Sequence, residues 1–390
     1  MWFVYVGVGL ALLIACGIYV RRRIGDALAH FGVSSRAIRI MRWVVAWLLF
    51  GFPILVVVSI VASLLLGRAT LPRFDSMAAS LLLAVPFMWA VLVVLQSGPW
   101  LIAIDLANRF VRRDRLRAIA VLAVVGAFAA YIPIRILVER GDVRVRQHVL
   151  GTGGAPFRIA FVADIQQDVH TTAARAREVY AIINASKPDV VLSGGDWINA
   201  GPDHIEAAAV AAATLTSRLG TFSVRGDHEH FAYVDRERSV GEVERAMQAR
   251  GIAMLNNEVR WFEHAGKRIA VLFLNYNYIV RTDEAEIEKL VASIANADYS
   301  IVVTHQLDRA LAPLLESKVD LVLAAHTHGG QINPVVGFMH VKLARLETRF
   351  VDGRYALGST TVIVTAGVGY SMVPFRYASP GSIELVELRL

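Results

Sequence analysis

Two things are scarce in this sequence of 390 residues: cysteine and, in the N-terminal third, acidic residues. The chain has one cysteine, Cys16, so a disulfide within the chain is excluded. Up to Leu150 there are 17 arginines and only 6 acidic residues. The whole chain has 40 basic and 33 acidic residues, which leaves 23 basic and 27 acidic residues beyond Leu150. The C-terminal part is therefore slightly acidic and has no basic stripe, so we expect no nucleic-acid partner.

Long apolar runs with few polar residues make up most of the N-terminal third. Residues 1–20, 43–66, 78–104 and 116–138 are each about as long as a helix must be to cross a bilayer. Three arginines follow the first run, whereas a cleaved signal peptide would carry its charge before the run. We therefore predict a four-helix transmembrane bundle over residues 1–140. The alternative, a buried soluble bundle, is disfavoured by the scarcity of polar residues.

Arginine placement predicts the orientation of this bundle. Arginines crowd the first connection, residues 21–42, and the third, residues 109–117, whereas the second has only Arg68 and Arg73. Because basic loops remain in the cytoplasm, the first and third connections are predicted to be cytoplasmic and both chain termini to lie on the outer side. Asp105, near the end of the third run, is predicted to be interfacial or paired with a nearby arginine.

After Pro156 the chain changes to short apolar segments, each followed by residues that can bind a metal ion. Such segments are typical of buried strands, and open α/β sheets keep their chemistry in the loops after strand ends. The pairs are 157–163 with Asp164 and Gln166, 190–193 with Asp196, 221–225 with Asp227 and His228, 300–304 with His305, and 319–324 with His326 and His328. A single strand-end aspartate is usually a turn or capping residue. Five such strand ends together indicate a site for divalent ions.

This series resembles the motifs of the calcineurin-like metallophosphoesterases, which are DxH, GD, GNH followed by an acid, a further His, and GHxH. The similarity covers about Phe157 to the C-terminus. The segment HTHGGQ at residues 326–331, with the closing segment Met372 to Arg376, resembles a branch of small bacterial membrane-linked members. The resemblance implies an α/β domain of two β-sheets packed face to face and flanked by helices. We place it at residues 156–390, after a linker at 141–155 that also fits an edge strand. Helices are expected between its strands, among them residues 204–219 and 307–315.

Two departures from the family pattern affect the metal. Gln166 stands where the family has the His of DxH, and Asp227 where it has the Asn of GNH. An amide oxygen is a weaker donor than imidazole for Zn or Fe and suits Mn or Mg better. Asp227 adds a negative charge, so the second ion should be held more tightly.

The resemblance implies a role for each strand-end residue. One ion would be held by Asp164, Gln166, Asp196 and His328, and the other by Asp196, Asp227, His305 and His326. A hydroxide shared by the two ions would attack phosphorus in line, and His228 would donate to a phosphoryl or leaving oxygen. Manganese is favoured, with Fe, Zn or Mg as alternatives. We expect His170 and His230 to be surface or pocket-lining residues, with Asp168 and His170 as substitute ligands should Gln166 not bind.

Two functions from different classes remain open. The first is a membrane-anchored phosphoesterase that hydrolyses a phosphate mono- or diester, with a lipid headgroup or lipid-linked phosphate as one candidate substrate, at the outer face of a bacterial inner membrane. The second is a non-catalytic metal-binding sensor or assembly protein, suggested by Gln166 and Asp227. Retention of His228, His305, His326 and His328 favours the enzyme.

The predicted orientation can be tested with reporter fusions. Because arginine placement decides orientation, a reporter that is active only outside the cytoplasm should work when fused after Leu390 and fail when fused near Arg113. Activity is measured for both fusions at matched expression. The reverse pattern would place the C-terminal domain in the cytoplasm.

Overall fold

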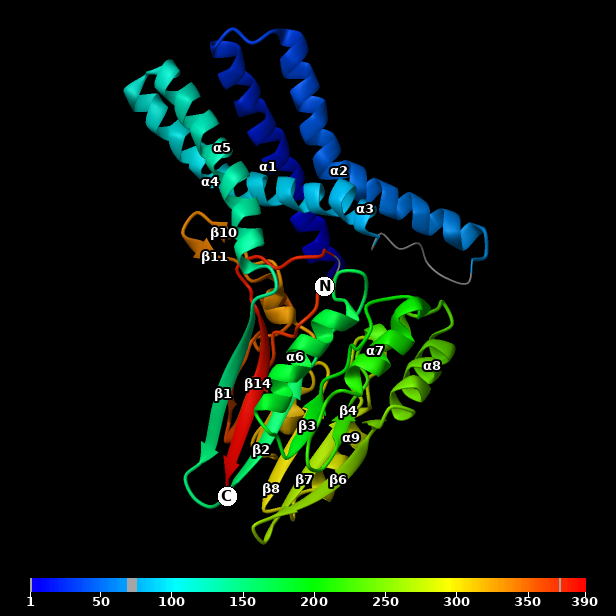
Figure 1. Ribbon diagram of the computed structural model, residues 1–390. Helices are drawn as coiled ribbons and strands as arrows, with labels where there is room; N and C mark the ends of the chain where they lie inside the picture. The colour runs from blue at the N-terminus through cyan, green and yellow to red at the C-terminus, as the bar shows by residue number, and fades with distance from the viewer. Residues whose placement is uncertain (1, 69–75, 372) are drawn as a thin grey trace.

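The computed structural model describes residues 2–68, 76–371 and 373–390, with the backbone alone for residues 2–6. Its N-terminal part is helical, with α1 (Trp2–His30), α2 (Ser35–Leu65), α3 (Met77–Ala79), the π-helical turn η1 (Ser80–Ala84), α4 (Val85–Val111) and α5 (Asp114–Glu139). Ser34 begins α2 by accepting a hydrogen bond from the backbone N–H of Ala37. In Figure 1, α1 starts beside the C-terminal domain and runs away from it, and α4 and α5 lie side by side.

Among the described residues, three helical stretches are long and apolar enough to cross a membrane: Ser35–Leu65, Met77–Val111 and Asp114–Glu139. They contain nearly all of the predicted spans 43–66, 78–104 and 116–138. The predicted first span, residues 1–20, falls within α1, which is not one of the three, and Met1 lies outside the described residues. The N-terminal helices thus indicate membrane association, while the count of four spans stays a prediction.

Asp105 joins three helices at the end of the bundle that is far from the domain. Its carboxylate lies 2.6 Å from Nε of Arg23 in α1 and 2.7 Å from Nε of Arg117 in α5. It also accepts a hydrogen bond of 2.7 Å from the Tyr19 hydroxyl. The expected pairing of Asp105 with nearby arginine is confirmed. Because a lone carboxylate is costly beside apolar helices, these partners stabilise its position.

The C-terminal domain consists of two six-stranded sheets and a small hairpin. The first sheet has the order β1-β14-β2-β3-β4-β5, the second has the order β12-β13-β9-β8-β7-β6, and the hairpin is β10-β11. The strands are β1 (Val143–Gly151), β2 (Pro156–Val162), β3 (Val190–Ser193), β4 (Thr221–Ser223), β5 (Ile252–Met254), β6 (Glu258–His264), β7 (Lys267–Leu274), β8 (Tyr299–Thr304), β9 (Leu321–Ala324), β10 (Val335–Val336), β11 (Met339–His340), β12 (Gly353–Leu357), β13 (Thr360–Val364) and β14 (Gly381–Arg389). The expected two-sheet domain is therefore present.

Side-chain alternation along each strand builds the layers. In β2, Phe157, Ile159 and Phe161 enter the core between the two sheets, whereas Ala160 and Val162 face the helices on the outer side. In β8 the same alternation places Ile301 and Val303 between the sheets and Val302 outside. The helices that cover the first sheet are α6 (Ala173–Ala185), α7 (Ile205–Ala212) and α8 (Arg236–Gln248), and those on the second are α9 (Glu284–Ser293) and α10 (Ala312–Leu315).

Three segments differ in extent from the sequence-based expectation. Residues 143–151, placed in a linker that also fitted an edge strand, form β1 and pair in parallel with β14. The helix predicted over 204–219 is shorter, at Ile205–Ala212, and the one over 307–315 is reduced to Ala312–Leu315. In the second case Asp308 Oδ1 accepts the N–H groups of Ala310 and Leu311, which forms a turn in place of the first helical residues.

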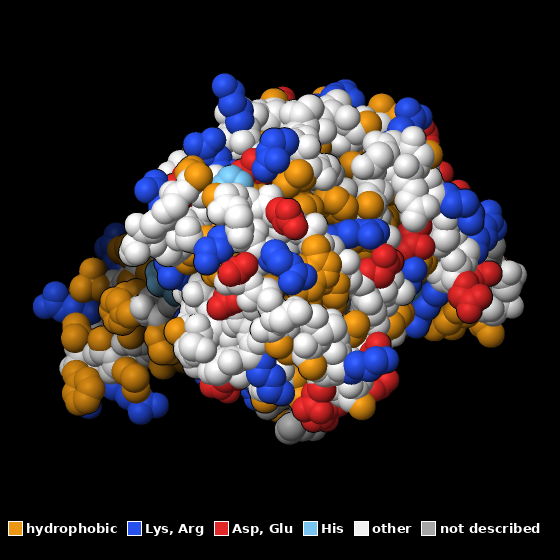
Figure 2. Space-filling model, turned by 90° about the horizontal axis from the view of Figure 1, so that it is seen from below, with side chains coloured by type: hydrophobic (Ala, Val, Ile, Leu, Met, Phe, Trp, Pro, Cys, Tyr) orange, Lys and Arg blue, Asp and Glu red, His pale blue; other side chains and the backbone are white. Residues whose placement is uncertain are grey.

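The surface of the domain and the ends of the bundle differ in character. Seen from below, basic and acidic side chains are mixed over the domain (Figure 2). Hydrophobic side chains gather at the left of that view, where the ends of α4 and α5 project beyond the domain, with basic side chains among them.

Polar contacts join the bundle to the C-terminal segment of the domain. Gln96 of α4 is buried, its Nε2 and Oε1 each lie 3.1 Å from the Tyr377 hydroxyl, and Oε1 accepts the Val335 N–H at 3.3 Å. At the end of α5, Glu139 accepts the N–H of Ala378, and the Arg135 guanidinium lies over the Tyr377 ring. The domain is thus docked on the bundle as well as tethered to it.

The Gln96–Tyr377 contact predicts a double-mutant cycle. Gln96→Leu and Tyr377→Phe each leave a buried polar group without a partner, so each should lower the unfolding free energy of the full chain by about 1–3 kcal/mol. The double variant should lose clearly less than the sum, because both partners have then been removed. Denaturation in detergent, with amide exchange over residues 373–378, measures the effect. Additive losses would mean that the two side chains are not coupled.

Candidate metal centre

The candidate ligands lie in loops at one edge of the two sheets. β2, β3 and β4 are neighbouring parallel strands of the first sheet, and β8 and β9 are neighbouring parallel strands of the second. Their carboxyl ends therefore meet, and the residues that follow them converge from both sheets. This arrangement agrees with the expectation from the sequence that the residues after these five strands contribute to one site.

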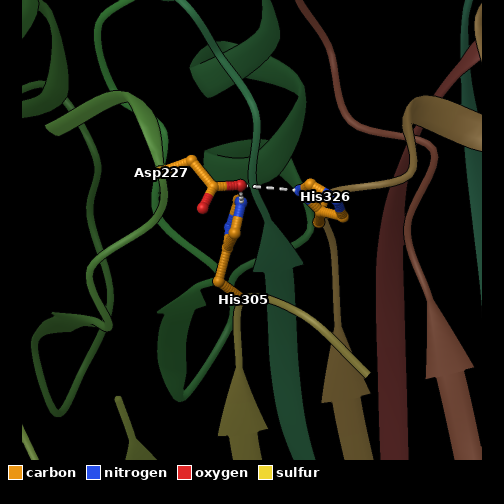
Figure 3. A group of neighbouring side chains, drawn as sticks. All are labelled: Asp227, His305 and His326. Atoms are coloured by element: carbon orange, nitrogen blue, oxygen red, sulfur yellow. Dashed lines mark ion pairs between the residues drawn. The ribbon is translucent and has the colours of Figure 1, made fainter. Parts of the chain in front are cut away.

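One cluster consists of Asp227, His305 and His326, which reach a common point from three different loops (Figure 3). Asp227 Oδ2 lies 2.8 Å from Nδ1 of His326 and 3.2 Å from Nε2 of His305. The second oxygen of Asp227 accepts the backbone N–H of Tyr278 at 2.7 Å, which fixes the carboxylate plane. His305 donates Nδ1–H to the carbonyl oxygen of Gly194 at 2.7 Å, so its Nε2 faces the cluster.

A second cluster shares His305 and adds Asp164 and Asp196. The distance from His305 Nε2 to Asp196 Oδ2 is 3.5 Å. Gln166 and His328, expected as further ligands of the same ion, lie next to this cluster: the Gln166 amide is 3.2 Å from Asp196 Oδ2 and 3.0 Å from Nε2 of His328. Within the described residues, neither metal-ligand cluster includes His328, which is linked to Asp196 through Gln166.

Two oxygens of the expected ligands, Asp164 Oδ1 and Gln166 Oε1, are buried without a hydrogen-bond partner, and His305 Nε2 faces the carboxylates of Asp196 and Asp227. Buried polar groups are otherwise almost always satisfied, so the two oxygens need an explanation. All of these atoms belong to residues expected as metal ligands, and carboxylate, amide and imidazole donors suit divalent ions such as Mn, Fe and Zn. The residues present therefore fit a metal site.

The carboxylates of the site favour protonated imidazoles beside them. Burial alone would lower the pKa values of His305 and His326, but the carboxylates beside them, Asp196 and Asp227 for His305, raise that pKa well above its usual value. Asp227 and Glu347 raise the pKa of His326 to about 9. Burial would raise the pKa of Asp227, yet its hydrogen bonds to the two imidazoles lower it well below the usual range. A metal ion would have to displace these protons.

Asp164 and His328 are perturbed chiefly by burial. Burial raises the pKa of Asp164 to about 6, against the opposing charge of His305. Burial and the positive charge of Arg376 lower the pKa of His328 far below its ordinary value, so this imidazole is neutral at pH 7. A neutral imidazole is the form that binds metal.

The backbone of the site is strained. Asp164, Gln166, Asp196, His326 and His328, which are five of the seven expected ligands, have φ angles between 46° and 73°. This left-handed region costs a non-glycine residue about 1–3 kcal/mol and persists where the surrounding structure imposes it, typically at functional sites. At Gly226 the constraint is steric: a Cβ at this position would collide with Oδ1 of Asp196.

Glu229 holds two of the ligand loops together. Its buried carboxylate accepts the backbone N–H groups of Asp196 at 3.0 Å, Trp197 at 2.7 Å and Gly226 at 2.6 Å. Burial and the charge of Asp196 raise the pKa of Glu229 to about 7 despite these donors. The loops after β3 and β4 are thereby fixed relative to each other.

His228, the expected proton donor, lies at the edge of the same site. Its backbone N–H donates to Asp196 Oδ1 at 2.8 Å, its Nδ1 contacts the carbonyl oxygen of Asn199, and the Phe231 ring packs edge-on against it. Asn199 in turn donates from Nδ2 to Asp168 at 2.7 Å. The contact with a carbonyl keeps a proton on Nδ1, so Nε2 is the atom free to exchange one.

The two histidines expected to be outside the ligand set, His170 and His230, belong to neither cluster. His230 is buried, with Nδ1 3.2 Å from the carbonyl oxygen of Gly226. His170 contacts the membrane-associated part of the chain, with Nε2 2.7 Å from Oγ of Ser80 in η1. Asp168, named with His170 as a substitute ligand, accepts the N–H groups of His170 and Thr171 and so caps a turn.

Sequence reasoning assigned no role to Glu347 and Arg376, both of which contact the site. Glu347 Oε1 lies 3.2 Å from Nε2 of His326 and accepts a hydrogen bond from Gln306. The Arg376 guanidinium is buried and donates to the carbonyl oxygens of His328, Ala366 and Gly369, and its Nη2 is 3.5 Å from Nδ1 of His328. Glu347 lies in a loop without a motif, whereas Arg376 was part of the closing segment and could have been found there.

Comparison with known proteins agrees with this geometry. Residues 157–330 match the family model described as calcineurin-like phosphoesterase. The chain is 25% identical over 262 residues to metallophosphoesterase YkuE of Bacillus subtilis, covering 65% of this chain and 86% of that protein. It is 25% identical over 248 residues to phosphodiesterase YaeI of Escherichia coli, covering 63% and 87% of the two chains. Two Helicobacter pylori relatives are each 30% identical to this chain, and the match covers 52% of the length of each relative.

Two further similarities are to a relative named as a transmembrane protein and to a solved structure. A Danio rerio protein named transmembrane protein with metallophosphoesterase domain is 26% identical over 283 residues, which cover 69% of this chain and 61% of that one. Among solved structures, a putative 5'-nucleotidase from Staphylococcus aureus aligns with a TM-score of 0.38 and 12% identity, covering 60% of this chain and 54% of the other. The family model and the sequence relatives agree: residues 157–330 of this chain match a calcineurin-like phosphoesterase domain.

Proposed function

We propose that the protein is a membrane-anchored phosphoesterase that uses two divalent metal ions to hydrolyse a phosphate mono- or diester on the extracytoplasmic side of a bacterial inner membrane. The match to the calcineurin-like phosphoesterase family supports a phosphoester hydrolase. The apolar N-terminal helices and the transmembrane relative support the membrane anchor. Arginine placement supports the orientation.

The observation that carries the proposal is that carboxylates and imidazoles converge at one place, where buried oxygens of the expected ligands lack hydrogen-bond partners. Two overlapping clusters, joined at His305, gather three carboxylates and two imidazoles at one sheet edge. Asp164 Oδ1 and Gln166 Oε1 are buried without hydrogen-bond partners. Buried carboxylates this close together are costly unless cations balance them. The arrangement therefore suits two ions that share ligands.

The ligand sets implied by the family resemblance contain the residues of the two clusters, but Asp196 rather than His305 is the shared ligand. One ion would be held by Asp164, Gln166, Asp196 and His328, and the other by Asp196, Asp227, His305 and His326. When bound, such ions neutralise phosphoryl oxygens and supply a strong nucleophile from water at neutral pH. Mn is favoured over Fe, Zn or Mg because Gln166 replaces an imidazole.

His228 would act on the leaving group. Its Nδ1 faces the Asn199 carbonyl and its backbone N–H donates to Asp196, so the ring is fixed with Nε2 directed away from both. Proton transfer at Nε2 to the leaving oxygen would then not require reorientation of the ring. Glu347, on the far side of His326, would hold that imidazole in the orientation that presents Nδ1 to the ion.

A non-catalytic metal-binding sensor or assembly protein is the second candidate, and one contact favours it. The Gln166 amide bridges Asp196 and His328, which links two ligands of the first ion to each other without an ion. A protein that binds a single ion between Asp227, His305 and His326 would retain metal and lack hydrolysis. The two functions differ in metal content and in turnover.

The hydrolase predicts metal-dependent turnover of simple esters. The purified full chain in detergent, stripped with a chelator, should hydrolyse p-nitrophenyl phosphate or its bis ester after Mn is restored, at least as fast as with Zn. Asp196→Asn, which removes the shared negative charge, should reduce the rate by about 100-fold or more. Arg260→Gln, on an exposed strand of the second sheet, is the matched control and should leave the rate unchanged.

Release of the coloured product and metal analysis together decide the outcome. Full metal content without turnover under Mn, Mg, Zn and Fe would favour the sensor. Metal content near zero with all four would contradict both functions.

Gln166 allows a test of the first ion. Gln166→His should raise the affinity for Zn or Fe, because imidazole binds these ions better than an amide oxygen. Gln166→Ala should weaken metal binding about 10–100-fold, and less than Asp196→Ala. Metal titration of the stripped protein measures each affinity. If Gln166→Ala has no effect while His170→Ala abolishes binding, the first ion is held by a displaced histidine and the ligand set is wrong.

A further inference from the structure

The segment from Val335 to Leu346 exposes four large apolar side chains. Phe338 is 89% exposed and Met339 69% exposed in the β10–β11 hairpin, and Leu343 at 60% and Leu346 at 52% follow in the turn η5 (Leu343–Leu346). Single exposed apolar residues are normal on protein surfaces, but a group of this kind marks a binding surface for a protein or a membrane.

The hairpin lies against a candidate membrane span. The Phe338 ring packs edge-on against the Trp100 ring, with centroids 5.2 Å apart, and the Val335 N–H donates to Gln96 of the same helix. Trp100 lies within the apolar stretch Met77–Val111, about 16 Å of helix from Val111 at ~1.5 Å per residue. A side chain that contacts Trp100 is therefore placed beside the part of α4 that would lie in or next to lipid.

The charges around the hairpin fit the surface of a bilayer. Arg345 lies between Leu343 and Leu346 in η5 and is exposed, and Arg349 is exposed just after it. Basic side chains at the base of an apolar group attract anionic headgroups, while the apolar side chains enter the acyl region. A protein partner would need an acidic surface around an apolar socket and would also have to fit against α4.

The same segment leads directly into the metal centre. Glu347, next to Leu346, contacts His326 and accepts from Gln306. Two partly exposed rings at the site are also apolar: Phe231 packs on His228, and Tyr278 packs on His326 with centroids 4.9 Å apart. Two of the side chains beside the expected proton donor and ligands therefore offer aromatic surface.

We propose that residues 335–346 form a lipid-inserting lip, which enters the outer part of the bilayer beside α4 and admits the phosphate ester of a membrane lipid to the metal centre. The inference rests on the proposed function for the reaction and adds the substrate class and its direction of entry. The bilayer that surrounds the helices supplies both the surface and the substrate.

Depth measurement tests the lip. In a Cys16→Ser background, Phe338→Cys labelled with an environment-sensitive fluorophore should show blue-shifted emission and quenching by lipids brominated on their acyl chains, with the full chain in nanodiscs. The matched control is Ala265→Cys, in the exposed turn of the β6–β7 hairpin, which should report water. If the label at 338 shows the same emission and the same lack of quenching as the label at 265, the lip does not enter the bilayer and the proposal is overturned.

Competition tests the substrate class. Hydrolysis of soluble bis(p-nitrophenyl) phosphate in nanodiscs should be inhibited by phosphatidic acid in the bilayer. Phe338→Glu with Met339→Glu should weaken this inhibition roughly 10-fold, equivalent to about 1.4 kcal/mol, while inhibition by inorganic phosphate stays the same. Phe338→Leu with Met339→Leu, which keeps the lip apolar, should behave as the natural chain.

The outcomes separate the two proposals. Inhibition by inorganic phosphate but not by phosphatidic acid would overturn lipid access while leaving the hydrolase intact. No hydrolysis of the soluble ester with any metal would overturn the proposed function, and the depth measurement would still decide whether the lip enters the bilayer.

Discussion

The structure depends on keeping several carboxylates out of water at one sheet edge. Asp164, Asp196, Asp227 and Glu229 are all buried there. Their charge is balanced by the raised pKa values of His305 and His326, and by backbone N–H donors to Glu229. The left-handed backbone conformation at five of the expected ligands is a further unfavourable contribution to the folding free energy. Such a site is unfavourable for folding in isolation, and the two apolar sheets must stabilise it.

How much of this arrangement the sequence predicts depends on whether the signal is local. Short apolar strands followed by Asp164, Asp196 or His305 can be recognised because burial and the strand end are both encoded within a few residues. Glu347 and Arg376 cannot be placed in the same way, since they reach His326 and His328 only through the tertiary path of a loop and a tail. The helix expected at 307–315 was mostly a turn because the Asp308 side chain competes for backbone N–H groups.

The membrane-associated helices are part of the domain's structure. A chain of polar contacts runs from Ser80 in η1 through His170 and Asp168 to Asn199, whose carbonyl contacts His228. Gln96 and Glu139 contact the tail that also carries Arg376. Because both sets of contacts end at residues beside the metal centre, the geometry of the site and the packing of the helices are linked.

The order of strands in the first sheet has a consequence for synthesis. β1 follows directly after α5, yet its partner in the sheet is β14, the final strand, which also separates β1 from β2. While the chain is being made, β1 and the edge of β2 must therefore remain without their partner until β14 has been made. Unpaired strand edges favour aggregation. The helices are thus made first, and the domain can complete its first sheet only after β14 has been made.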